Sequence, residues 1–242
     1  MVYKLLLRIN RSQEPIGYFL MLAFLSFFIN DAQAQSAEQV LQEIKQKLDK
    51  VNDYEAAGKM KTNVAFIKTP VANVKVYYKK PDMVRIINES GISFIPKGSV
   101  NISLNNIFAN LPNFDLIDAG NNQEGLRVIK VLPKNDTADI VLSTLYIDEK
   151  KMLILKSNTT TRENGSYELM MSYGKYADYS LPDRIIFSFN TKDYKLPKGI
   201  TLDYDEGSEK NNDKLKNKKG TVEIVYSGYS INKGIDNKIF QR

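Results

Sequence analysis

Residues 54 to 94 alternate between apolar and polar side chains, and this pattern constrains the fold more than any other feature of the chain. The positions that would share the apolar face are Met60, Thr62, Val64, Phe66, Val74, Val76, Tyr78, Val84, Ile86, Ile92 and Phe94. An alternation of period two is typical of strands that bury one face and expose the other. The breaks at Pro70, Pro81 and Gly91 are short, so consecutive strands are expected to pair antiparallel. The sequence thus predicts a meander whose apolar face must be covered.

The composition removes most kinds of catalytic and metal site. The 242 residues include no His, Cys or Trp. The usual ligands of zinc, copper and haem are therefore missing, as are Ser-His-Asp and Cys-His catalysis and lipid attachment at a cysteine. Acidic residues gather at Asp115 and Asp118 and at 203–206, where they fit turns better than a hydrolase with paired carboxylates. We therefore expect no enzyme, no cofactor and no metal.

The net charge is modest. The formal value of +6, from 34 basic and 28 acidic residues, permits contact with anionic surfaces but does not call for nucleic acid as a partner.

The first 34 residues have the three parts of a secretory signal. Lys4, Arg8 and Arg11 precede an apolar run from 16 to 29, which ends at the small residues Ala32-Gln33-Ala34. A membrane anchor is the alternative, but a span needs about 20 apolar residues and this run is shorter. Cleavage after Ala34 would leave Gln35 first, without a lipid anchor. We expect residues 35–242 to form a soluble, monomeric single domain in the periplasm.

An amphipathic helix is predicted over about 37–52. Ser36 and Gln39 have the spacing of a capping box at its start. Apolar residues recur at helical spacing, at Val40, Leu41, Ile44, Leu48 and Val51. The helix therefore has one apolar stripe, which we expect to lie on the sheet.

The rest of the chain reads mainly as strands. The candidates are 126–132, 139–148, 151–161, 167–173, 184–189 and 221–229. Asn164-Gly165 predicts a hairpin turn, because both residues tolerate positive φ. Residues 206–219 are rich in lysine and nearly devoid of apolar side chains, which predicts a flexible loop that is solvated or, as a second reading, touches lipid headgroups.

Ile107, Phe108 and Leu111 have helical spacing before Pro112, which predicts a short apolar helix. Such a helix between strands could be a lid over the interior or a connector that plugs a gap in the core. The residues leave both readings open.

About ten strands and one long helix predict an α+β fold that is mostly β. The curved antiparallel sheet would form a half-open barrel around the N-terminal helix and the short helical lid. Its interior would either be filled by side chains or hold an apolar ligand. The candidate lining residues are Met60, Val64, Phe66, Val76, Tyr78, Val84, Ile86, Phe94, Leu169, Met171, Ile185, Phe187, Phe189 and Ile224.

Three segments carry a resemblance to a known family. They are the strand 76–85 with Lys80-Pro81 at its turn, the acidic hairpin 145–151 and the Leu-Pro-Asp-Arg step within 173–185. Together with the signal segment and the capped helix, the chain resembles the LolA-type family of outer-membrane lipoprotein carriers over most of residues 36–230.

The resemblance implies a function. In that family a half-open barrel receives the acyl chains of lipoproteins or other lipids in the periplasm and carries them toward the outer membrane. Inner- and outer-membrane sorting proteins would then be partners, and the basic residue before the proline, here Lys80, would latch the lid. A secreted β domain that binds a protein partner on its surface is the alternative function.

Overall fold

The structure is a computed structural model that describes residues 35–63, 71–81, 83–88, 107–108, 110–135, 138–162, 165–190 and 219–241. Residues Ser36–Arg242 form one compact unit. The expected signal segment and most of the lysine-rich 206–219 segment lie outside the described residues. Three candidate lining residues also lie outside them: Val64, Phe66 and Phe94.

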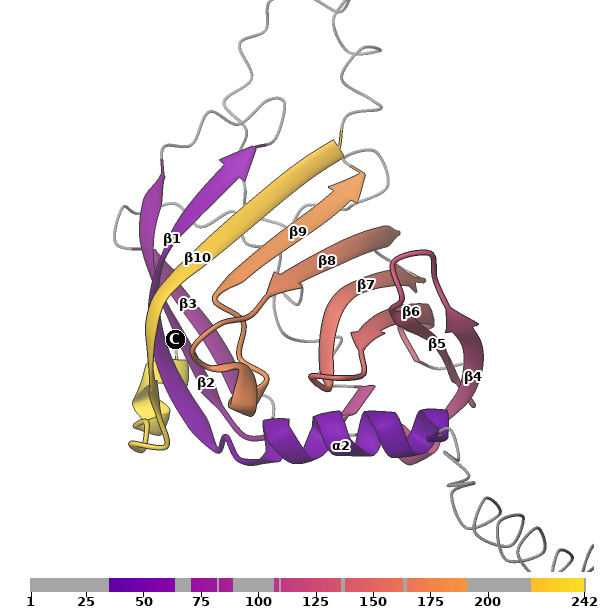
Figure 1. The fold of residues 1–242 in the computed structure, drawn as a ribbon. Helices are drawn as coiled ribbons and strands as arrows, with labels where there is room; N and C mark the ends of the chain where they lie inside the picture. The colour runs from indigo at the N-terminus through magenta and orange to yellow at the C-terminus, as the bar shows by residue number, and fades with distance from the viewer. Residues whose placement is uncertain are drawn as a thin grey trace, which may run out of the picture. The chain divides into compact units, whose positions relative to one another are not determined.

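One α-helix and ten strands make up most of the described chain (Figure 1). The elements are α2 Ala37–Asp49, β1 Asp53–Asn63, β2 Ala72–Lys79, β3 Met83–Asn88, β4 Phe114–Asn121, β5 Arg127–Pro133, β6 Ile140–Asp148, β7 Leu153–Thr161, β8 Ser166–Ser172, β9 Arg184–Asn190 and β10 Lys219–Ile231, with 3-10 turns η2 Leu111–Asn113, η3 Ala177–Tyr179 and η5 Asn237–Phe240. No helix within the described residues is long and apolar enough to cross a membrane.

The ten described strands form one antiparallel sheet in the order β3-β2-β1-β10-β9-β8-β7-β6-β5-β4. In this part of the chain the edge strands β3 and β4 do not pair with each other, so the sheet is open between them. Figure 1 shows the sheet curving around α2, which lies across its concave side. The predicted fold class, a half-open barrel around the N-terminal helix, is confirmed.

A glycine in β1 helps the sheet bend. The pairing of β1 with β10 shifts between Ala57 and Gly58, so that β10 has an extra residue there. A Cβ at Gly58 would lie 2.6 Å from the carbonyl oxygen of Val225, so no larger residue fits without moving the backbone. A bulge of this kind bends a strand and increases its twist, which suits the centre of a strongly curved sheet.

The capping box predicted at Ser36 is present. The Ser36 hydroxyl accepts from the backbone N–H of Gln39 at 3.2 Å, and the Gln39 side chain accepts from the Ser36 N–H at 2.8 Å. The helix ends at Asp49, earlier than the predicted residue 52. The side chain of Asn232 explains the difference, because it bonds both the Lys50 carbonyl, at 2.8 Å, and the Asn52 N–H, at 2.7 Å.

The apolar faces predicted from the alternation point inward. In β1, residues 54, 56, 58, 60 and 62 are buried, while 57, 59, 61 and 63 are exposed. β3 departs from the expectation, because Val84 and Ile86 are only half-buried. The edge position of β3 accounts for this, since among the described strands it has a neighbour on one side only.

Arg127 forms a cluster of ion pairs at the β4–β5 end of the sheet. Its guanidinium is buried and bonds the carboxylates of Asp118, at 2.6 Å, and Glu149. The hydrogen bond from Arg127, with a smaller contribution from the Gly120 N–H, lowers the pKa of Asp118 below its usual value of 3.8. A depressed carboxyl pKa stabilises the folded state above the unfolded pKa, and this contribution is lost as the pH falls through the folded value.

We expect Arg127→Met to lower the free energy of unfolding at pH 7 by about 1–2 kcal/mol, because two carboxylates then lose their charged partner. The difference from wild type should shrink as the pH falls below the usual carboxyl pKa and through the lowered pKa of Asp118 in the folded wild type, because protonated Asp118 no longer gains from the charge of Arg127. Urea unfolding at pH 7 and pH 3 measures both effects. Arg184→Met is the control, because the Arg184–Glu223 pair is more exposed and should contribute less. Equal losses for the two variants, or a loss independent of pH, would contradict the assignment.

Candidate ligand-binding cavity

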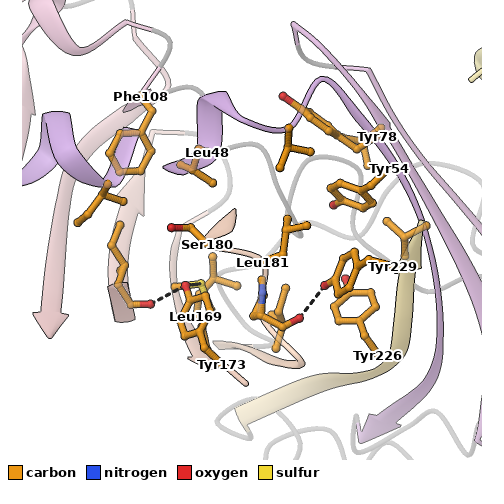
Figure 2. Close-up of a pocket in the computed structure, with 18 residues that line it drawn as sticks. Leu48, Tyr54, Tyr78, Phe108, Leu169, Tyr173, Ser180, Leu181, Tyr226 and Tyr229 are labelled. Atoms are coloured by element: carbon orange, nitrogen blue, oxygen red, sulfur yellow. Dashed lines mark hydrogen bonds between the residues drawn. The ribbon is translucent and has the colours of Figure 1, made fainter. Parts of the chain in front are cut away.

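An apolar cavity lies between α2 and the concave face of the sheet (Figure 2). Ile44 and Leu48 of α2 line it on one side, and side chains from β1, β2, β3, β7, β8, β9 and β10 line it on the other. The segment Ser180-Leu181-Pro182, between η3 and β9, closes part of the wall. No Lys, Arg, Asp or Glu is among the described residues of this lining. The cavity is therefore suited to an uncharged, mainly hydrocarbon group.

Seven of the residues predicted for the cavity and its lid line it. They are Val76, Tyr78, Val84, Phe108, Leu169, Met171 and Ile185. Each lies at an inward position of its strand, apart from Phe108, whose backbone is helical. The alternation thus identified side chains that the fold brings together from β2, β3, β8 and β9.

Other predicted residues lie elsewhere in the core. Met60, Phe187, Phe189 and Ile224 are buried but are not part of the lining. The ring centroids of Phe187 and Phe189 lie 5.3 Å apart, and those of Tyr167 and Phe187 lie 5.4 Å apart. These aromatic side chains therefore pack against one another. Ile86 is half-buried against the core.

The three predicted lid residues occupy different positions. Ile107 and Phe108 are buried, and η2 begins at Leu111 and includes Pro112. Phe108 lines the cavity. Phe108 and Leu111 also line a more open groove of about 600 Å³ between the first half of α2 and β4. The segment therefore contacts the interior through Phe108.

Tyrosines form much of the wall, and they were not predicted as a group. Tyr54 stacks on Tyr78 at 5.3 Å and meets Tyr229 edge-on at 5.3 Å. The hydroxyl of Tyr229 donates to the carbonyl of Pro182 at 2.6 Å, and that of Tyr173 donates to Ile154 at 2.9 Å. Burial raises the pKa of Tyr173, so its hydroxyl stays neutral. The wall is thus built from packed aromatic rings, and the hydroxyls of Tyr173 and Tyr229 are bonded to protein carbonyls.

The cavity is small in this arrangement. Its volume is about 80 Å³. An engineered protein cavity of about 150 Å³ holds a benzene molecule, and ordinary ligand pockets span about 300–1,000 Å³. The cavity in this arrangement is therefore smaller than a whole acyl chain.

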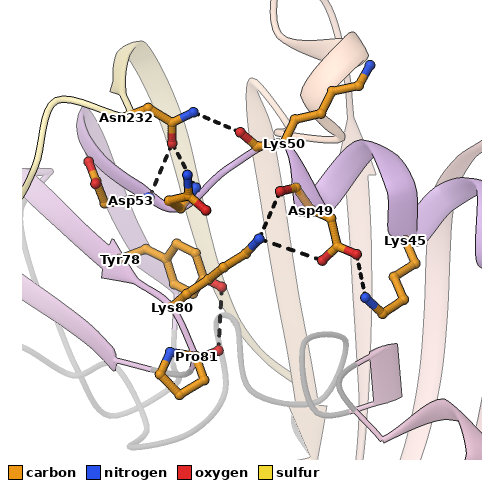
Figure 3. Close-up of polar contacts among 9 residues, drawn as sticks. Lys45, Asp49, Lys50, Asp53, Tyr78, Lys80, Pro81 and Asn232 are labelled. Atoms are coloured by element: carbon orange, nitrogen blue, oxygen red, sulfur yellow. Dashed lines mark hydrogen bonds and ion pairs between the residues drawn. The ribbon is translucent and has the colours of Figure 1, made fainter.

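Two kinds of contact hold α2 over the cavity. Its first half is fixed by buried apolar residues, among them Val40 and Leu41. Its last turn is fixed by polar groups of other elements (Figure 3). The Lys80 ammonium donates to the Asp49 carbonyl at 2.8 Å and lies 3.7 Å from the Asp49 carboxylate. The Lys47 ammonium donates to the carbonyl of Lys151.

Lys80, the predicted latch, therefore binds the C-terminal turn of α2 in this structure. It sits just after β2, and the Asp49 carboxylate that it approaches is half-exposed. The contact ties the helix to the β2 end of the sheet next to the cavity.

The described residues offer no metal site. No group of three or more His, Cys, Asp or Glu side chains among them is placed to hold a metal ion.

Comparison with known structures supports the fold. A candidate outer membrane lipoprotein-sorting protein domain from Vibrio parahaemolyticus is 12% identical and covers 84% of this chain and 94% of its own, with a TM-score of 0.50. A DUF1329 family protein from Desulfovibrio piger is 12% identical and covers 84% and 95%, with a TM-score of 0.53. A LolA superfamily protein from Nitrosomonas europaea is 11% identical over 84% and 97%, at a TM-score of 0.46 that is too low to support an argument.

Sequence comparison adds no closer relative. No protein-family model matches the chain, and no curated protein matches it. At these identities the structural likeness concerns the fold alone. The fold is LolA-like: one curved, open antiparallel sheet with a helix across its concave side.

Proposed function

We propose that the protein is a periplasmic carrier that binds the acyl chains of lipoproteins or other lipids in the cavity beneath α2 and moves them toward the outer membrane. The observation that carries this proposal is an uncharged, apolar cavity between a curved sheet and a helix whose last turn is held by polar contacts. The LolA-like fold supports it, since one structural neighbour is described as an outer membrane lipoprotein-sorting domain. The role involves no chemical step.

The two ends of α2 suggest how the cavity opens. Separating apolar surfaces costs about 25 cal/mol for each Å² exposed to water, so the first half of the helix stays docked. Exposed ion pairs contribute about 0–1 kcal/mol each, because water replaces them. The last turn of α2, with Leu48 over the cavity, is therefore the part that moves. Each CH₂ of an entering chain then gains about 0.8 kcal/mol on leaving water.

We expect Lys80→Met to speed the uptake and release of an acyl ligand several-fold, with a loss of unfolding free energy below about 1 kcal/mol. The reason is that Lys80 joins the last turn of α2 to the sheet. Stopped-flow exchange of a fluorescent fatty acyl probe measures the rates. Lys45→Met is the matched control, because Lys45 pairs with the same Asp49 carboxylate but lies on the same helix. Unchanged rates for Lys80→Met, or equal changes in both variants, would contradict the proposal that the Lys80–Asp49 contact restrains the last turn of α2.

A binding experiment tests the function itself. Purified protein is mixed with a synthetic diacylated lipopeptide and, separately, with the same peptide lacking acyl chains, and complexes are counted by size-exclusion chromatography. We expect a soluble complex with the acylated peptide only. Equal binding of both peptides would instead show recognition of the peptide.

The small volume of the closed cavity favours a second candidate. A β domain that binds a protein partner on its surface would have an interior filled by its own side chains, and about 80 Å³ is close to that condition. Absence of binding to either peptide would support this candidate.

A further inference from the structure

One polar atom in the cavity wall has no hydrogen-bond partner among the residues that the structure describes. It is the hydroxyl oxygen of Ser180, which is shielded from solvent in a residue that is 8% exposed. Figure 2 shows this hydroxyl between Leu48 and Leu169, which both line the cavity. The hydroxyl groups of Tyr173 and Tyr229, in the same wall, bond protein carbonyls. Ser180 thus differs from these two tyrosines in that its hydroxyl has no hydrogen-bond partner among the described residues.

The backbone at Ser180 makes the choice of serine informative. Its φ is +51°, in the left-handed region, where it ends the turn η3 and donates its N–H to Ala177 at 3.0 Å. Glycine or asparagine adopts this conformation more readily, and such turn ends usually carry one of them. A buried hydroxyl without a partner also destabilises the fold. Neither property benefits the protein without ligand, which indicates that the hydroxyl acts when the cavity is occupied.

We propose that the Ser180 hydroxyl donates a hydrogen bond to a carbonyl oxygen of the bound lipid, so that the cavity takes acyl chains in ester or amide linkage in preference to plain hydrocarbon. This rests on the proposed function, because it assumes that the cavity binds acyl chains. A serine hydroxyl both donates and accepts, and an ester or amide carbonyl accepts.

The same lining argues against free fatty acids. The described residues around the cavity include no Lys or Arg, so an ionised carboxylate would be buried without an opposite charge. An ester or amide carbonyl is neutral and needs only a donor. The acyl groups of lipoproteins and of membrane lipids both carry such carbonyls. Both therefore belong to the class of ester- and amide-linked acyl ligands that the Ser180 hydroxyl would favour.

The test compares three probes of similar length: methyl decanoate, undecane and decanoate at pH 8. Their affinities are measured by displacement of a fluorescent apolar dye from the purified protein. In wild type we expect methyl decanoate to bind more tightly than undecane or decanoate. In Ser180→Ala the affinity for methyl decanoate should fall about fivefold, as expected for one net hydrogen bond, while that for undecane stays the same.

Two further variants make the result specific. Ser157→Ala is the matched control, since Ser157 also has a buried hydroxyl without a partner among the described residues but does not line the cavity. It should leave all three affinities unchanged. Ser180→Gly removes the hydroxyl and suits the left-handed backbone, so it repeats the test should Ser180→Ala prove unstable in a melting experiment.

The outcomes separate this inference from the proposed function. One outcome is that wild type binds both methyl decanoate and undecane while the two Ser180 variants bind each probe as wild type does, or lose the same factor for both probes. In that case the role of Ser180 is wrong and the carrier proposal stands. If wild type binds neither probe, both proposals fail. A loss confined to methyl decanoate supports the carbonyl contact. A matching loss of decanoate would show that free fatty acids belong to the same class.

Discussion

Leu169→Asp should reduce the affinity for acyl ligands by at least about 100-fold. Leu169 lies in β8, is 3% exposed and faces the cavity below α2. An aspartate there would place a carboxylate against the hydrocarbon chain, with no Lys or Arg among the described lining residues to pair with it. A bound chain would bury that charge further, and burying an unpaired charge costs several kcal/mol. Titration with a fluorescent fatty acyl probe measures the loss.

Met170→Asp is the matched control for this change. Met170 is the next residue of the same strand, points to the other face of the sheet and is 38% exposed. It should bind the probe like wild type. Leu169→Gln carries no charge and provides a second test if Leu169→Asp unfolds, which circular dichroism will show. Binding by folded Leu169→Asp at the wild-type affinity would rule out this cavity as the ligand site.

Leu41→Ala should lower the free energy of unfolding by about 2–5 kcal/mol, as measured by urea unfolding. Leu41 is completely buried in the first half of α2, and it does not line the cavity. Removing its side chain loses buried apolar surface and leaves an empty space. The loss should be large because this half of the helix keeps α2 docked in the account given above.

Leu48→Ala is the comparison on the same helix. Leu48 is half-buried over the cavity, so we expect it to cost about 1 kcal/mol or less and to raise the rate of ligand uptake. The two variants therefore separate the fixed half of α2 from the half that moves. A larger loss for Leu48→Ala than for Leu41→Ala would reverse that assignment and remove the proposed opening movement.

The fold could be predicted because its signals are local. The alternation at Met60 and Thr62, the capping box at Ser36 and the apolar stripe of α2 each follow from residues close together in sequence. The strand ranges predicted between 126 and 229 agree with the structure to within about two residues, as the bounds of β6 and β7 show, whereas no range was predicted for β4. The LolA-like fold was also suggested by the resemblance around Lys80-Pro81.

The cavity was predicted only in part, because its position along the strands depends on distant contacts. Alternation shows that Leu169 and Phe187 both face inward, but Phe187 packs on Phe189 and Tyr167 while Leu169 meets the open space. The tyrosine wall and the buried hydroxyl of Ser180 arise where β2, β10 and the turn after η3 converge. No sequence pattern within a single segment indicates that these three parts of the chain lie together.

Native mass spectrometry of the protein, gently purified from the compartment where it is made, tests the central claim most directly. We expect the wild-type protein to carry an acyl lipid or lipoprotein, and Leu169→Asp prepared in the same way to lack it. A wild-type protein that arrives without any lipid, and takes none up when lipid is added, would contradict the account.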